Sequence, residues 1–192
     1  LLSALTIAAL VHLFNAIHYA SQRGYIGKIR VLKAVIRLAG NYADAAESMA
    51  AEEKDPQRKK ELAQIAATCR WVPANPARNF TEAMQSLWFD QILSTPASTH
   101  NFGRFDQYMY PFYQHDIDNN ISTREDIKEL LCHMWVKVNE PKMKTVQSLC
   151  LAGQKPDGSE GVNDLTVLCL EVARMVKTPY PNLSLRVSKN SP

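Results

Sequence analysis

The sequence predicts a mainly helical polypeptide in which a few short strands appear late, an order that suits one shell of a larger α/β protein. Apolar residues recur at three- and four-residue steps through most of the first 140 residues, whereas strand-like apolar runs come only after residue 145. The 192 residues are 46% hydrophobic and 21% charged, which is enough apolar material for a sizeable core. Because there are only 7 glycines and no repeat or low-complexity tract, no flexible linker is expected.

Two helices are expected at the start of the chain, over residues 1–20 and 28–51. The first is apolar nearly all round, and Gly24 and Gly27 are expected to break the helix between the two segments. Apolar side chains at helical spacing in the second segment are Ile29, Leu32, Ile36, Ala39 and Tyr42.

Two further helices are expected over residues 56–69 and 80–93. Asp55 is a suitable N-cap, and Pro56 fits the first helical position. Pro73 and Pro76 favour an extended connection between the two helices.

The second half of the chain mixes helices, strands and irregular segments. Residues 94–113 are expected to be irregular, whereas residues 122–126 have the capping-box pattern of a helix that continues to Val138. Asn163–Asp164 should cap a helix that ends near Met175. Short strands are predicted at 146–151 and 183–187, the second of them buried, and a turn at 155–158.

Several classes of function are excluded by the sequence. The net charge is +3 and the basic residues are dispersed, so no nucleic-acid-binding stripe is present. A calcium loop at 116–120 fails because Ile121 stands where the sharp turn requires glycine. Four widely spaced cysteines make neither a metal site nor a disulfide framework, which predicts reduced thiols in a cytoplasmic protein: Cys69, Cys132, Cys150 and Cys169.

The most specific stretch runs from Gly103 to Tyr113 and combines aromatic rings with Arg104, Asp106 and Gln107. An arginine fork can hold a carboxylate or several backbone carbonyls, and a buried arginine must be paired. Asp106 or Glu140 could serve as its partner. We interpret Arg104, Asp106 and Gln107 as a structural motif that fixes a loop, with direct substrate binding as the alternative.

Several segments, in order, resemble the pyruvate formate-lyase-like glycyl-radical enzymes. Two are specific, namely GRFDQYMYP at 103–111 and VNDLT at 162–166. Supporting matches include Val72–Ala74, Trp135 and Leu183–Val187, and the resemblance extends over residues 28–192.

The resemblance implies that residues 1–192 are part of a single domain, a fragment truncated at both ends. The family fold is a ten-stranded α/β barrel wrapped in helices. The radical is stored on a backbone glycine, as a modification and not as a bound cofactor, and a separate S-adenosylmethionine-dependent iron–sulfur enzyme installs it. The resemblance also implies a small-molecule substrate and a homodimer or larger oligomer of the full-length protein.

No catalytic residue is assigned within the chain, because the resemblance places the radical glycine and the thiyl cysteine beyond Pro192. The polar loop before the aromatic stretch supplies the candidate substrate-binding residues, since loops on a rigid scaffold often carry function. These candidates are Ser98, Thr99, His100 and Asn101.

The family implies thiyl-initiated radical chemistry on a small molecule, of the lyase, dehydratase or formate acetyltransferase type. Glycerol- and choline-type lyases carry an acidic residue and then Asn/Asp–Gly before the aromatic stretch, whereas residues 94–102 here read STPASTHNF. A fumarate-adding alkyl- or benzylsuccinate synthase subunit is therefore an alternative. A radical-free scaffold or binding paralogue is a second.

Residues 1–20 lack formal charge, yet they contain the polar residues Ser3, Thr6, His12, Asn15 and His18. A membrane span needs about 20 predominantly apolar residues, so we predict a buried helix and no membrane partner. The full-length protein should remain in the supernatant after high-speed centrifugation of a lysate. Recovery in the membrane pellet that resists extraction with salt would contradict this prediction.

Overall fold

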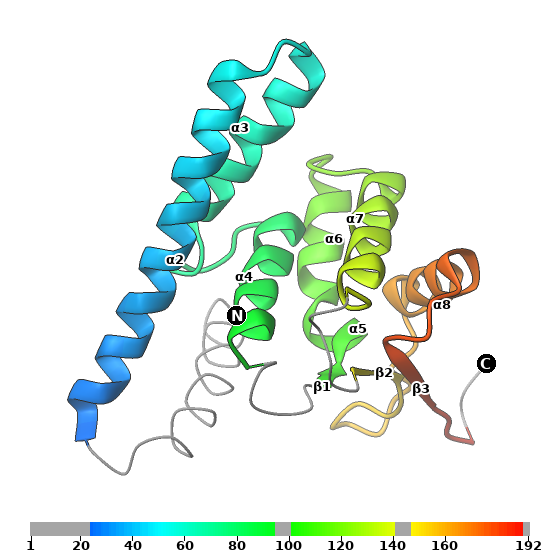
Figure 1. The fold of residues 1–192 in the computed structure, drawn as a ribbon. Coiled ribbons are helices and arrows are strands. Elements are labelled where there is room, and N and C mark those ends of the chain that lie inside the picture. Colours follow the sequence, from blue (N-terminus) through cyan, green and yellow to red (C-terminus); the bar gives the residue numbers. More distant parts are fainter. Residues whose placement is uncertain (1–23, 95–100, 141–146, 190–192) are drawn as a thin grey trace. The chain divides into compact units, whose positions relative to one another are not determined.

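The computed structural model describes residues 24–94, 101–140 and 147–189 (Figure 1). The helix predicted at 1–20 lies outside these ranges. The chain divides into two compact units, Leu1–Leu93 and Ser94–Pro192, and each is considered by itself.

The first unit contains three helices in its described part: α2 (Gly24–Glu52), α3 (Pro56–Trp71) and α4 (Phe80–Ser94). Helices α2 and α3 pack side by side as a hairpin (Figure 1). Most of the α2 side chains on the packed face are small, which lets the two helices approach closely. The buried residues of α2 are Val35, Ala39, Ala43, Ala46 and Ala50, and those of α3 are Leu62, Ala66, Thr68 and Cys69.

The sequence identified helix α2 but misplaced its start and most of its buried face. Gly24 and Gly27 lie in its first turn and do not break it, because the backbone N–H groups there lack helical partners in any case. Ile29, Ile36 and Tyr42 are 42–51% exposed, whereas alanines form most of the contact with α3. The prediction chose the large apolar side chains, whereas the face of α2 that packs against α3 consists mainly of small ones, which let the two helices approach closely.

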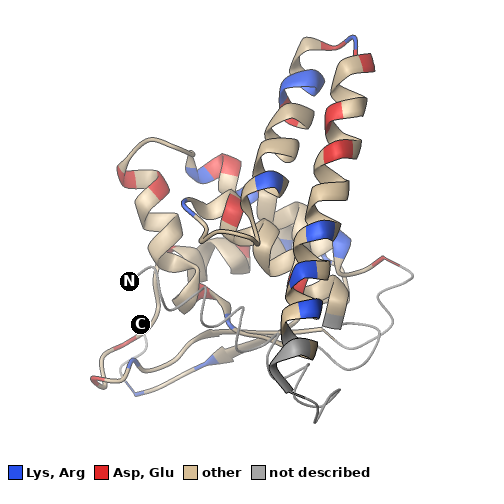
Figure 2. Cartoon of the chain, turned by 90° about the vertical axis from the view of Figure 1, so that its left-hand side faces the viewer, with Lys and Arg blue, Asp and Glu red and all other residues tan. Residues whose placement is uncertain are grey.

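Charges are segregated along α2. The basic residues Arg30, Lys33 and Arg37 precede the acidic residues Asp44 and Glu47, so the two signs occupy successive halves of the helix (Figure 2). This order opposes the helix dipole, which favours acidic residues near the start. Helix α3 compensates in part, because Arg70 donates to Asp44 and, at 2.8 and 3.1 Å, to Glu47. These side chains are about half exposed, so solvent screens each pair and its contribution to stability is small.

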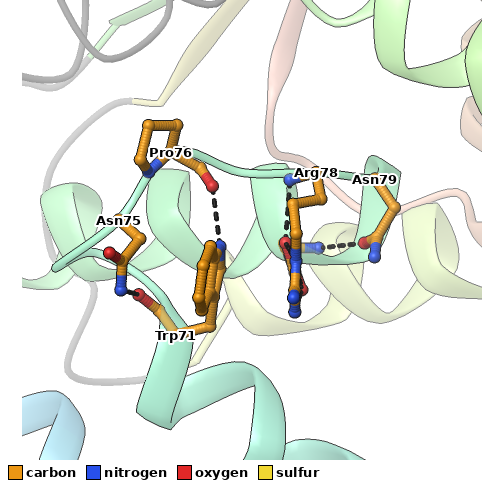
Figure 3. A network of polar contacts seen from close by, with 6 residues as sticks. Trp71, Asn75, Pro76, Arg78 and Asn79 are labelled. Carbon is orange, nitrogen blue, oxygen red and sulfur yellow. Dashed lines mark hydrogen bonds and ion pairs between the residues drawn. The ribbon is translucent and has the colours of Figure 1, made fainter.

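Side-chain hydrogen bonds fix the connection from α3 to α4 (Figure 3). The Trp71 indole N–H donates to the Pro76 carbonyl at 2.8 Å, and the Arg78 guanidinium lies 4.0 Å from the centre of the Trp71 ring. Arg78 also pairs with the buried carboxylate of Glu82 at 2.5 Å. The Asn79 side chain accepts from the Glu82 amide at 2.8 Å and so caps the start of α4.

The second unit contains a three-stranded sheet and four helices within its described residues. In chain order they are β1 (Asn101–Arg104), α5 (Phe105–Tyr108), α6 (Tyr110–Asp118), α7 (Arg124–Lys137), β2 (Ser148–Ala152), α8 (Asp164–Val176) and β3 (Asn182–Arg186). The strands are parallel in the order β1-β2-β3, so strand order follows chain order. The capping box predicted at the start of α7 is present, between Thr123 and Asp126. The predicted cap Asn163 also forms a capping box, with Thr166 of α8.

The two faces of this sheet differ in chemistry. Leu149 and Leu151 of β2 are fully buried, and helices α6 to α8 lie on one side of the sheet (Figure 1). The alternate residues of β2 and β3 form the opposite face, which is polar and partly exposed, because successive side chains point to opposite sides. We call this surface the polar face, and its residues are Asn101, Ser148, Cys150, Asn182, Ser184 and Arg186.

Two expectations for this unit are wrong. Residues 101–118 are mostly regular, as β1, α5 and α6, because burial of Phe105, Met109 and Tyr113 orders the aromatic stretch. Strand β3 is mainly exposed and not buried, since it pairs only with β2 among the described strands. In the described part of the chain, no helix has the combination of length and apolar character that spanning a membrane requires.

The α2–α3 interface predicts the effect of enlarging Ala43, which has no exposed surface. Ala43→Leu should destabilise the full-length protein by about 1–3 kcal/mol, because three extra carbon atoms have no room there. Chemical denaturation would measure the change. The matched control is Ala45→Leu, two residues along on the exposed side of the same helix, where leucine should have little effect. Equal stability of the two variants would refute the close packing.

Candidate functional site

The candidate site is the polar face of the sheet together with the corner that holds its carboxyl end. The corner begins at Arg104, the last residue of β1, which donates to three successive carbonyls at the end of β2. Its Nε and one terminal nitrogen reach Ala152 O at 3.0 and 2.8 Å, and the remaining bonds are to Gly153 O at 3.1 Å and Gln154 O at 3.0 Å. Ala152 and Gly153 have φ values of 57° and 85°. The backbone thus turns sharply at residues 152–153, and this turn directs three carbonyl oxygens toward the planar guanidinium of Arg104.

Asp106, in α5, is fully buried and holds the same corner from another direction. Its Oδ2 accepts from the Ala152 N–H at 2.7 Å and from the Thr166 hydroxyl at 2.5 Å. The Asn163 side chain donates to the Asp106 carbonyl at 3.0 Å. One aspartate therefore joins the end of β1, the end of β2 and the start of α8. The other carboxylate oxygen, Oδ1, has no hydrogen-bond partner among the described residues.

Gln107 closes the loop that follows β2. Its amide donates to the Gly161 carbonyl at 2.6 Å, and the predicted turn at 155–158 is present. Gly161 and Gly153 approach so closely that a Cβ on Gly161 would lie 2.2 Å from the Gly153 oxygen. Only glycine fits at position 161, because any side chain there would collide with the backbone of Gly153.

The expected partners of Arg104 were wrong. Neither Asp106 nor Glu140 binds it: Asp106 binds Ala152 and Thr166, and Glu140 pairs with Lys137 at 2.7 Å. The physical reason is that the sharp turn after β2 concentrates carbonyl oxygens next to the guanidinium. Those oxygens come from residues 48 to 50 positions later, which local spacing could not identify.

Of the predicted substrate-binding residues, Ser98, Thr99 and His100 lie outside the described ranges. Asn101 is the first residue of β1 and is exposed. Its side-chain oxygen accepts from the Gly103 N–H at 2.8 Å. Asn101 is paired with Ser148, so the structure places it on the polar face, at the amino end of the strands.

The polar face was missed by sequence reasoning. The alternation of Leu183 and Leu185 with Ser184 and Arg186 was the signal that could have revealed it. The sequence predicts a buried strand at 183–187, which leaves no exposed face for these polar residues. In the register of β2 and β3, Cys150 is paired with Ser184 and Ala152 with Arg186, so these residues lie on the same face of the sheet.

The four cysteines are free and occupy different environments. Burial raises the pKa of the Cys69 and Cys132 thiols. Burial also raises the pKa of Cys169 well above its usual range, and the nearby Asp106 carboxylate adds to that shift. These three are neutral packing residues, whereas Cys150 lies half-buried on the polar face. Among the described residues, no group of three potential metal ligands comes together.

The contacts of Arg104 predict a large loss of stability when its side chain is removed. Arg104→Ala should destabilise the full-length protein by about 3 kcal/mol, because carbonyls that accept from a cation lose their donor while remaining partly shielded from water. Thermal and chemical denaturation measure this. The control is Arg174→Ala at an exposed position of α8, which should change stability by less than about 0.5 kcal/mol. An Arg104→Ala protein that melted like wild type yet lost substrate binding would make Arg104 a substrate ligand.

Comparison with known proteins identifies the family. The family model for pyruvate formate lyase-like proteins matches residues 7–192. The isethionate sulfite-lyase of Oleidesulfovibrio alaskensis is 39% identical in an alignment over 181 residues, and the match covers 84% of this chain and 22% of that protein. The trans-4-hydroxy-L-proline dehydratase of Clostridioides difficile is 34% identical in an alignment over 177 residues, and the match covers 83% of this chain and 22% of the relative. The chain thus spans about a fifth of the length of these curated relatives.

Solved structures agree with the sequence matches. The structure that describes 1,2-propanediol dehydration in Roseburia inulinivorans has a TM-score of 0.79 and 33% identity, covering 97% of this chain and 27% of that one. A glycyl radical enzyme from Archaeoglobus fulgidus has a TM-score of 0.82 and 29% identity, covering 100% and 27%. The chain belongs to the pyruvate formate lyase-like family of glycyl-radical enzymes.

Proposed function

We propose that this chain is part of the catalytic subunit of a glycyl-radical lyase or dehydratase, which breaks a carbon–carbon or carbon–heteroatom bond in a small molecule. The observation that carries the proposal is the similarity to named lyases and dehydratases over more than four fifths of the chain. A relative from Klebsiella oxytoca, named (2S)-3-sulfopropanediol dehydratase, extends the same pattern at 32% identity.

The topology of the second unit supports a barrel. Parallel strands in chain order, with helices on one side, form a sheet that can curl so that its other side faces inward. In the proposed ten-stranded barrel of the complete protein, the polar face would line the interior. Asn101, with Ser98, Thr99 and His100 just before it in the sequence, would line the amino end of this interior.

The residues of this chain would shape and hold that interior. The corner of Arg104, Asp106 and Gln107 fixes the carboxyl ends of β1 and β2, and the packed helices exclude water from the outer side. The radical would be supplied by a backbone glycine and a cysteine beyond Pro192, after modification by an S-adenosylmethionine-dependent iron–sulfur enzyme. Three cysteines of this chain are buried or packed in helices, which fits structural roles for them. The complete protein is proposed to be a cytoplasmic homodimer or larger oligomer.

The names of the relatives favour this proposal over the alternatives. They describe a sulfite-lyase, two dehydratases and a decarboxylase, which is the bond-breaking side of the family. None of these four names describes a fumarate-adding synthase or a radical-free scaffold.

The proposed function predicts a glycyl radical in the complete protein. After anaerobic incubation with a cognate activating enzyme, a reductant and S-adenosylmethionine, the full-length protein should give the glycyl signal by electron paramagnetic resonance. Residues 1–192 alone should give none, because the modified glycine is proposed to lie beyond them.

The control omits S-adenosylmethionine and should abolish the signal. A full-length protein that stays silent beside an activated relative prepared in parallel would favour the radical-free scaffold. A signal from residues 1–192 alone would place the radical glycine inside this chain and refute the proposed location.

A further inference from the structure

Arg186 ends β3 at the carboxyl edge of the sheet, on the polar face. It is paired in register with Ala152, and Ser184 precedes it on the same face. Its side chain is exposed, and it makes no hydrogen bond or ion pair to the residues that the structure describes. Ligands of parallel α/β sheets bind at the carboxyl ends of the strands, so this cation stands where an anion would be received.

Gly153 makes room for this arginine. A Cβ on Gly153 would lie 3.0 Å from the Arg186 Cβ, 3.2 Å from its Cδ and 3.1 Å from its Nε. The stem of Arg186 therefore lies directly against the buried backbone of residue 153. That backbone is itself held by Arg104, which donates to the Gly153 carbonyl at 3.1 Å. The first part of the Arg186 side chain is thus held against a fixed surface, so the side chain loses less conformational entropy when a ligand binds.

The neighbouring charged groups are already occupied. The Arg104 guanidinium donates hydrogen bonds to three backbone carbonyls. Glu160 accepts from the Gly161 and Val162 amides at 2.9 and 3.3 Å with one oxygen, and from the Ser188 hydroxyl at 3.0 Å with the other. The bond from Ser188 to Glu160 ties the chain just after Arg186 to the loop that carries Gly153. It thereby fixes the position of the strand end.

We propose that Arg186 binds an anionic group of the substrate, such as a carboxylate or sulfonate, and so determines specificity for acidic substrates. A planar guanidinium can donate two parallel hydrogen bonds to such a group. This inference rests on the proposed function and adds a class of substrate to it. Gly153 is the supporting position, because any side chain there would displace Arg186.

The test uses the full-length protein without activation, so that binding is separated from radical chemistry. Isothermal titration calorimetry at fixed salt would compare two pairs of probes that differ in their acidic group: isethionate against ethylene glycol, and L-lactate against 1,2-propanediol. The acidic member of at least one pair should bind wild type more tightly than its neutral partner. Arg186→Gln should weaken that binding at least about tenfold, since a charge-assisted bond contributes about 1.5–3 kcal/mol. Arg186→Lys should lose less, and binding of neutral alcohols should not change.

Arg174→Gln, at an exposed position of α8, is the matched control and should bind as wild type does. Equal affinity of wild type and Arg186→Gln for the acidic probes would overturn the proposal. So would a wild-type protein that prefers the neutral probes, or one that binds neither acid more tightly than about 10 mM. The glycyl signal of Arg186→Gln should match that of wild type. A missing signal in both proteins would refute the proposed function, while the titrations would still decide the role of Arg186.

Discussion

The peptide groups of a single residue, Ala152, join three elements of the second unit, namely β1, α5 and β2. Its N–H donates to the buried carboxylate of Asp106, and its carbonyl accepts from Arg104. The residue has a φ of 57°, a conformation that costs a non-glycine residue about 1–2 kcal/mol. Hydrogen bonds with the side chains of Arg104 and Asp106, which are two residues apart, offset that cost. Strand β2 consequently ends at a defined point, and the direction of the following loop is fixed.

Much of the fold could be predicted because it depends on local signals. Asp55, Thr123 and Asn163 accept hydrogen bonds at helix starts, as the types and spacing of the residues indicated. The extent of α7 and α8 followed from apolar periodicity. The packed face of α2 could not be obtained in this way, because the choice of Ala43 over Tyr42 depends on how closely α3 approaches.

The candidate site was less accessible to sequence reasoning, because its contacts are long-range. Arg104 was recognised as a residue that needs partners, but backbone oxygens look alike in every sequence and carry no signal of their own. The polar face depends on the register that pairs Cys150 with Ser184, and register emerges only when the strands are aligned. The contact between Arg186 and Gly153 is also long-range, because the two residues are neighbours in space but lie far apart in the chain.

The order of the strands has a consequence for synthesis on the ribosome. Each strand pairs with the one made before it, so the sheet can grow in the direction of translation. Arg104 nevertheless leaves the ribosome about 50 residues ahead of the carbonyls that it binds. At roughly 5–20 residues per second, the guanidinium spends about 3 to 10 seconds in water before its partners emerge. During that interval Asp106 also lacks its backbone partner, so the nascent corner remains open until the loop after β2 has left the ribosome.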